Sequence, residues 1–435
     1  MRNSAALALE PIATPTAGRP CLDARVLELR QHYARLWWET SCEWPALGDI
    51  VPRPQQRDSE REALRLIDEL VREVEACPDG EDRALWRRRL QARVRRFGAE
   101  RLGWPAGYQG LLFADEFYEA TVEFVRRARA FDAGVRGEDV TQALRNVWIV
   151  NSLQMLLGLR VWLAPSVFAY SMLYPWTDNV LDDPSVGADT KAGLNERLSA
   201  RLAGTRVLPQ SEHERQVFRL VEMIEEEYDR GTYPEVYASL LAIHGGQVRS
   251  LRQQGGAQPP YLTDLLGISI EKGGTSVLVD GYLAAGWLSG EEADFAFGYG
   301  VVLQLLDDLQ DVGADRRAGH MTVFSQCAGR WPLDALASRL YHLVCRVIDE
   351  SPRFAEPRCA DQRDLIRRNC TFLLVGAVAE NAEFFTRPFI GALEERWAFE
   401  FSAMRRLRHR AAKRYGALLK SLRRRRNVTS LFDLL

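Results

Sequence analysis

The chain has 435 residues, of which 46% are hydrophobic and 27% are charged. This mixture is typical of folded globular proteins that bury a sizeable core, and it excludes a mainly disordered, collagen-like or disulfide-scaffold protein. The 57 Lys and Arg residues nearly balance the 59 Asp and Glu residues, so the net charge is only −2. The composition of the whole chain therefore gives no reason to expect a nucleic-acid partner.

Cysteine usage and hydropathy indicate where the protein works. Seven cysteines are widely spread and form no Cys-x-x-Cys pair, which predicts reduced thiols. The longest apolar region, 147–176, is interrupted by polar residues such as Asn151 and by Pro165, whereas a membrane-spanning helix needs about 20 apolar residues. The apolar stretch at 5–9 is too short for a signal peptide. We therefore expect a cytoplasmic protein without a transmembrane segment.

The pattern along the chain is helical. The first 55 residues contain six prolines, which makes long helices unfavourable there except over 22–38. From residue 56 onwards, apolar residues recur at three- and four-residue spacing among charged ones, which predicts successive amphipathic helices. No run alternates apolar and polar residues as a strand would. The predicted fold class is all-α.

Composition divides the chain into three predicted parts. Residues 1–104 form an N-terminal extension that is partly Pro-rich and then helical, 105–420 form a helical domain, and 421–435 form a basic tail. The role of the extension stays open between a helical cap over the functional site and a homodimer contact. The four arginines at 423–426 are interpreted as a solvated helix end rather than a nucleic-acid site.

One predicted helix carries an unusual acidic group. The segment 300–312 is apolar on nearly all sides, yet it contains Gln304, Asp307, Asp308 and Asp311. Gln304, Asp307 or Asp308, and Asp311 are spaced by three or four residues and therefore point along one face. Two like charges about 4 Å apart repel by roughly 4 kcal/mol at an effective dielectric constant near 20. The group therefore needs a cation or a water-filled cleft, and Mg²⁺ is the natural candidate because it prefers oxygen ligands.

A second acidic segment precedes it by 129 residues, counted from Asp178 to Asp307. Asp178 and Asp182 are one helical turn apart and follow a largely apolar stretch. If both acidic turns face one cavity, they would bind several magnesium ions. The alternative for each segment is an ordinary helix end with solvated aspartates, which Pro184 makes plausible for Asp183.

Between the two acidic segments lies a pair of glycines, Gly273 and Gly274, inside a helical stretch predicted over 261–288. Each glycine in a helix interior costs about 1 kcal/mol relative to alanine, which suggests a functional helix break there. Backbone N–H groups freed beside Lys272 and Thr275 would suit a phosphate. The alternative is that these glycines let two helices approach closely.

These segments together resemble the class I, all-trans isoprenoid synthase superfamily, which includes polyprenyl diphosphate synthases and terpene cyclases. The resemblance covers roughly residues 105 to 420 and is best between Lys272 and Thr322. It comprises a Lys-Thr segment at Lys272, the Tyr299-Gly300 pair, the second acidic motif Gln-x-x-Asp-Asp-x-x-Asp from Gln304 to Asp311, and the first acidic motif at Asp178-Asn179-x-x-Asp182. Asn179 replaces the second Asp of that first motif, and Asp183 is the candidate substitute.

The differences from this family's usual sequence pattern indicate which of its two activities, chain elongation or cyclisation, to expect. Chain-elongating synthases hold isopentenyl diphosphate with a Gly-Gly-Lys-Arg-type segment near the start and an Arg pair after the first motif, and neither is visible here. His320 also stands where the family usually has Lys. The chain therefore looks like a terpene cyclase on the prenyltransferase scaffold. The alternatives are a prenyl diphosphate synthase that uses isopentenyl diphosphate and a noncatalytic relic of the fold.

The resemblance implies a class I isoprenoid synthase-like helical bundle and a carbon–oxygen lyase acting on phosphates. Such an enzyme ionises an allylic prenyl diphosphate to give a terpene hydrocarbon or alcohol plus diphosphate. The residues implied to hold three Mg²⁺ ions are Asp178, Asp182, Asp183, Asp307, Asp308 and Asp311, of which Asp178, Asp182, Asp307 and Asp308 are implied to be catalytic. Lys272, Thr275 and Gln304 are implied to bind the substrate. Aromatic candidates for stabilising the carbocation are Phe168, Tyr170, Trp176, Tyr282 and Trp287, although aromatics at this spacing are more often core.

Overall fold

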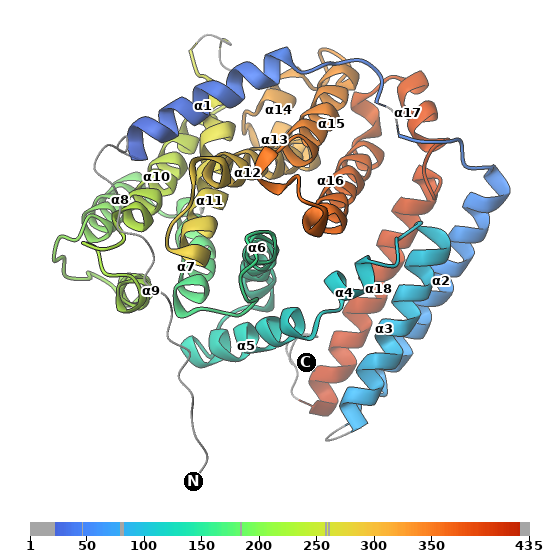
Figure 1. The fold of residues 1–435 in the computed structure, drawn as a ribbon, viewed down its shortest axis with the longest axis horizontal. Coiled ribbons are helices and arrows are strands. Elements are labelled where there is room, and N and C mark those ends of the chain that lie inside the picture. The colour runs from blue at the N-terminus through green and yellow to red at the C-terminus, as the bar shows by residue number, and fades with distance from the viewer. Residues whose placement is uncertain are drawn as a thin grey trace.

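The computed structural model describes residues 22–45, 47–78, 82–182, 185–256, 259 and 262–426, and over these residues it is built from helices without a strand (Figure 1). The α-helices are α1 (Leu22–Glu39), α2 (Arg53–Glu75), α3 (Asp82–Arg101), α4 (Tyr108–Leu112), α5 (Asp115–Phe131), α6 (Gly137–Leu156), α7 (Pro165–Asp182), α8 (Ala188–Leu202), α9 (Glu212–Glu227), α10 (Pro234–Ser250), α11 (Leu265–Ala285), α12 (Gly290–Gln310), α13 (Val312–Ala318), α14 (Val323–Cys327), α15 (Asp334–Asp349), α16 (Ala360–Glu380), α17 (Arg387–Glu394) and α18 (Phe401–Arg426). Short 3₁₀ helices occupy Leu251–Gln253, Pro352–Phe354, Pro357–Cys359 and Ala382–Phe384. The all-α prediction is confirmed.

The centre of the molecule is the pair α11 and α12. Both helices are buried on almost every side and are surrounded by α1, α6, α10, α15 and α16. Local sequence sets where they begin and end: the Asp264 side chain caps α11, Gly286 ends it with a φ of 73°, and Ser289 forms a capping box with Glu292 at the start of α12. The Asp264 and Ser289 side chains each accept a hydrogen bond from a backbone N–H that the first helical turn would otherwise leave unpaired.

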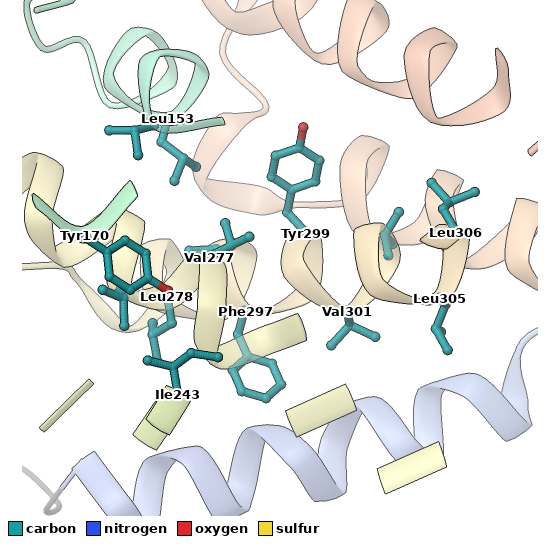
Figure 2. Close-up of a cluster of buried hydrophobic side chains, with 14 of the residues drawn as sticks. Leu153, Tyr170, Ile243, Val277, Leu278, Phe297, Tyr299, Val301, Leu305 and Leu306 are labelled. Carbon is teal, nitrogen blue, oxygen red and sulfur yellow. The ribbon is translucent and has the colours of Figure 1, made fainter. Parts of the chain in front are cut away.

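The side chains of these two helices fill the core in several directions. Figure 2 shows Phe297 pointing from α12 toward α1, while Tyr299, two residues on, points the opposite way. The Phe297 ring lies 5.7 Å from the ring of Tyr33 on α1, whose hydroxyl donates to the Asp294 carbonyl. Packing on α12 explains why the predicted helix at 22–38 forms despite its Pro-rich surroundings, and α1 confirms that prediction.

Glycines bring α11 and α12 into backbone contact. A Cβ atom on Gly300 would overlap the Gly273 carbonyl, and one on Gly274 would overlap the Phe297 ring. Neither Gly273 nor Gly274 has a positive φ, and α11 is continuous from residue 265 to 285. The predicted helix break at these glycines is therefore wrong, and close helix packing accounts for them.

A separate layer of helices lies at one edge of the molecule, where α2 packs against both α3 and α18 (Figure 1). The predicted N-terminal extension, 1–104, thus contributes α1 to the central bundle and α2 and α3 to this layer. The α18 helix crosses the predicted boundary at residue 420 and continues to residue 426, so 421–426 extend it. The rest of the predicted tail lies outside the described residues.

One carboxyl group is enclosed in the core. Asp280 on α11 is fully buried, and its Oδ1 accepts a hydrogen bond of 2.9 Å from the Asn146 amide on α6. The same amide donates to Ser171 on α7, whereas Asp280 Oδ2 has no hydrogen-bond partner among the residues that the structure describes. Burial raises the pKa of Asp280 well above its usual value, because desolvation penalises the charged form.

The described part of the chain agrees with two simpler expectations. None of its helices combines the length and hydropathy needed to cross a membrane. Its six described cysteines are all free, and Cys21 lies outside the described residues. These findings agree with the expected lack of a transmembrane segment and with the expected free thiols.

Candidate active site

The second acidic motif lies at the C-terminal end of α12, and the structure separates its members. Asp307 and Asp311 are exposed, one helical turn apart, and the Asp311 backbone N–H donates to the Asp307 carbonyl. Asp308 points to the other side and is only 5% exposed. The motif therefore presents two carboxylates outward and one inward.

Asp308 already has hydrogen-bond partners. Its Oδ2 accepts from the Ser269 hydroxyl at 2.7 Å, and its Oδ1 accepts from the Gln304 amide at 2.8 Å. Burial raises the pKa of Asp308 to about 6, although both hydrogen bonds favour the charged form. Ser269 and Gln304 thus hold Asp308 against α11, which leaves Asp307 and Asp311 as the more accessible oxygen donors.

A fourth carboxyl group lies near Asp307, Asp308 and Asp311 and was not predicted from the sequence. Asp315 on α13 is half-buried, and its pKa is raised to about 7, first by burial and then by the negative charges of Asp308, Asp311 and Asp307. The negative charges that add to this rise show that Asp315 lies near the other three aspartates. The signal in the sequence was the continued four-residue spacing from Asp307 through Asp311 to Asp315. We call Asp307, Asp311 and Asp315 the acidic group.

Lys272 on α11 lies within electrostatic reach of this region. Its positive charge lowers the pKa values of Asp308 and Asp315, and it adds to burial in lowering the pKa of His320. The helix pair α11 and α12 thus brings a predicted substrate-binding lysine to the second acidic motif. The lowered pKa of His320 favours its neutral form.

Thr275 and Gln304 are less available than predicted. The Thr275 side chain is completely buried, and its hydroxyl donates to the Glu271 carbonyl within the same helix at 2.6 Å. The Gln304 amide donates to Asp308. Both predicted substrate-binding groups thus make hydrogen bonds within their own helices, so the outward-facing polar groups are the acidic group and its neighbours.

The first acidic motif is described only by its backbone. Asp178 and Asp182 lie in the last turns of α7, but the side chains of Asp178, Asn179 and Asp182, and all of Asp183, lie outside the described residues. Neighbouring contacts locate this end of α7. Thr177 lines a cavity with Gln247 of α10, and a Cβ on the adjacent Gly246 would lie 3.3 Å from Lys272 Cα. The C-terminal end of α7 is therefore on the Lys272 side of the bundle.

The cavity between α7, α8 and α10 is small. Its volume is about 20 Å³, and its lining includes Tyr170, Leu173, Leu240 and Ile243. Such a space holds one water molecule. A larger opening of about 930 Å³ lies between α5, α8 and α9, and none of the predicted site residues with a described side chain lines it. A prenyl chain bound beside α7 would have to widen the smaller cavity.

The predicted cation-stabilising aromatics lie mainly in the core. Phe168 and Trp176 both pack against Phe131 on α5, with ring centroids 6.2 and 6.3 Å away. Tyr170 does line the small cavity, and its hydroxyl donates to the Ser276 carbonyl at 3.3 Å. Tyr282 is buried in α11, and Trp287 is 36% exposed beyond its end. Of the five candidates, only Tyr170 lines this small cavity.

The donor set has the chemistry that magnesium prefers, because exposed carboxylate oxygens are hard ligands. Among the side chains that the structure describes, no three His, Cys, Asp or Glu residues are grouped closely enough to hold a metal ion. The first acidic motif is not among those side chains. The predicted site thus depends on two helix ends, of which the structure describes the side chains of one.

Comparison of this chain with models of known protein families, with curated proteins and with solved structures finds no match. The family resemblance therefore depends on the two acidic motifs, the Lys272 segment and the Tyr299-Gly300 pair alone. The geometry of those residues is the evidence on which a function can be argued.

Proposed function

We propose that this protein is a class I terpene synthase that ionises an allylic prenyl diphosphate with Mg²⁺, giving a terpene hydrocarbon or alcohol and inorganic diphosphate. One observation carries the proposal. Asp307 and Asp311 are exposed on consecutive turns beside Lys272, on the side of the bundle where α7 ends with Asp178 and Asp182. Two acidic helix ends and a lysine at one end of an apolar bundle suit a metal-bound diphosphate.

The charges explain how these residues would divide the work. Asp307 and Asp311 would hold magnesium, with Asp178, Asp182 and Asp183 as the candidates from α7. Bound magnesium supplies positive charge that stabilises the departing diphosphate. Lys272 would add a direct contact to the diphosphate oxygens. Asp308 would keep Gln304 and Ser269 in place from the buried side of α12.

The apolar side of the bundle would receive the hydrocarbon chain. Leu173, Leu240 and Ile243 line the cavity beside α7 with Tyr170, and apolar walls exclude water from a reactive cation. The face of Tyr170 would stabilise positive charge. Because the cavity is small without a ligand, substrate binding would have to move α7 or the side chains of α10.

The test is product analysis with single substrates. Purified protein and Mg²⁺ are incubated with geranyl, farnesyl or geranylgeranyl diphosphate, each with and without isopentenyl diphosphate. We expect one allylic diphosphate of farnesyl length or longer to yield an extractable terpene and inorganic diphosphate, without consumption of isopentenyl diphosphate.

Two outcomes would contradict this proposal. A longer prenyl diphosphate that appears only with isopentenyl diphosphate would identify a chain-elongating synthase instead. Release of no product from any substrate, together with no binding of diphosphate and Mg²⁺ by calorimetry, would favour a noncatalytic protein.

A further inference from the structure

Basic and acidic residues are unevenly distributed along the chain, although its net charge is close to zero. The helices α2, α3 and α18 contain 24 Arg and Lys residues against nine Asp and Glu residues, a formal charge of +15. The remaining residues contain 33 basic and 50 acidic side chains, a formal charge of −17. Such asymmetry within one chain indicates an anionic partner for the basic part.

Most acidic side chains of this layer form ion pairs with arginines of the same layer. On the α3 side of α2, Glu69 and Glu73 both pair with Arg93, and Glu62 pairs with Arg101. On the α18 side, Asp68 pairs with Arg410 and Arg414, and Glu60 pairs with Arg406. The paired carboxylates of α2 thus lie at its contacts with α3 and with α18. They therefore neutralise few of the arginines that face outward.

The outward side of α3 collects the remaining cations. Arg88, Arg89 and Arg96 are exposed, and no acidic partner is found for them among the described residues. Leu85 is 57% exposed. At 100° per residue these four side chains, together with the exposed Ala92 and Ala99, project from one side of the helix. We call Leu85, Arg88, Arg89, Ala92, Arg96 and Ala99 the α3 basic face.

We infer that the α3 basic face docks on the surface of an anionic lipid bilayer. Exposed arginines on one side of a helix attract anionic headgroups, and the exposed Leu85 among them can enter the headgroup region of a bilayer. The lipid phosphates bind the guanidinium groups, and the apolar part of the bilayer beneath the phosphates accepts the Leu85 side chain. Nucleic acid offers phosphates without an apolar region beneath them, so the exposed Leu85 favours a lipid partner.

The position of α3 suits such contact. It lies with α2 and α18 at one edge of the molecule (Figure 1), and the exposed Lys413 and Lys420 of α18 belong to the same layer. No helix in the described part of the chain can span a membrane, so the contact is peripheral. None of the proposed catalytic residues lies on α3, so this inference stands or falls independently of the proposed reaction.

The test is co-sedimentation of the full chain with vesicles of phosphatidylcholine alone or mixed with phosphatidylglycerol. We expect binding only to the anionic vesicles and weaker binding at high salt. A triple variant, Arg88→Gln, Arg89→Gln and Arg96→Gln, should bind about 100-fold more weakly, because each basic side chain near such a surface contributes about fivefold. The matched control removes the same charge from exposed arginines elsewhere, through Arg35→Gln, Arg145→Gln and Arg206→Gln, and should bind like the unmodified protein.

A second variant distinguishes lipid from nucleic acid. Leu85→Gln leaves the charge unchanged and should still weaken vesicle binding several-fold. The lipid assignment is overturned if the triple variant binds vesicles as well as the control. It is also overturned if the protein binds duplex DNA more tightly than vesicles and Leu85→Gln does not weaken vesicle binding. Should the triple variant unfold by circular dichroism, the three single substitutions carry the same test, each with about a fivefold loss expected.

Discussion

At the scale of single residues, neighbours along the chain differ sharply in their surroundings. Asp307 and Asp308 are consecutive, yet one is exposed while the other accepts hydrogen bonds from Ser269 and Gln304. Successive residues on a helix point 100° apart, so one side of α12 meets α11 while the next meets solvent. The acidic motif therefore combines an exposed pair, Asp307 and Asp311, with one buried carboxyl group, Asp308.

The outward pair should be needed for turnover and dispensable for folding. Asp311→Asn should reduce kcat/KM by about tenfold or more, as expected when a ligand of a catalytic metal is weakened. Its melting temperature should not fall, because the substitution relieves repulsion with Asp307 and Asp315. Steady-state kinetics and calorimetry check both points.

The matched control is Glu291→Gln, which removes an exposed carboxylate at the opposite end of α12. This control should retain full activity. Equal activity in Asp311→Asn and in the control, or undiminished activity in excess chelator, would remove Asp311 from the proposed site.

The buried Asp280 should make stability depend on pH. Its pKa is raised by burial in the folded protein, so the folded state binds more protons than the unfolded state once the pH exceeds about 4. The free energy of unfolding should therefore fall as the pH rises above that point, with a contribution of about 1.4 kcal/mol per pH unit from this group until its folded pKa is reached.

Asp280→Asn should remove this contribution, because an amide keeps the hydrogen bond from Asn146 without a titrating proton. Denaturant unfolding of both proteins at several pH values measures the difference in slope. Parallel pH profiles for the two proteins would show that Asp280 does not titrate as its burial indicates.

At the scale of elements, the contact between α11 and α12 depends on the absence of a side chain. Gly273 and Gly300 approach so closely that a methyl group on either would overlap the other's backbone. This contact also brings Lys272 toward the acidic group, because Lys272 adjoins Gly273 on α11 and Asp307 follows Gly300 by about two turns on α12. Helix packing and the candidate site are thus parts of one arrangement.

Gly300→Ala should destabilise the protein by about 2 kcal/mol or more, since inserting a methyl group into a packed contact forces the helices apart. Gly376→Ala is the control in α16, where a Cβ would meet nothing within 4 Å, and it should raise stability by about 0.5 to 1 kcal/mol through helix propensity. Unfolding in denaturant measures both changes. Similar changes in the free energy of unfolding for the two variants would contradict the close contact between Gly273 and Gly300.

At the scale of the whole molecule, helices far apart in sequence share one layer, and charge is distributed between that layer and the bundle. Arg410 and Arg414 near the end of the chain pair with Asp68 near its beginning. The bundle keeps most of the carboxylates, including the acidic group, whereas the layer keeps the excess of arginine. An anionic surface would therefore attract one edge of the protein and repel the rest, which orients the molecule.

Sequence alone determined the features that depend on local periodicity. Three- and four-residue spacing predicted an all-α chain, a helix from residue 22, and a helix carrying Asp307 and Asp311, because each of these follows from which residues lie one turn apart. Tertiary structure decided what each helix side meets. It placed Asp308 and Thr275 inside, added Asp315 to the acidic group, kept α11 unbroken at Gly273, and gathered distant arginines at one edge. Periodicity defines the sides of a helix, but burial and charge at each side are set by the helix that packs against it.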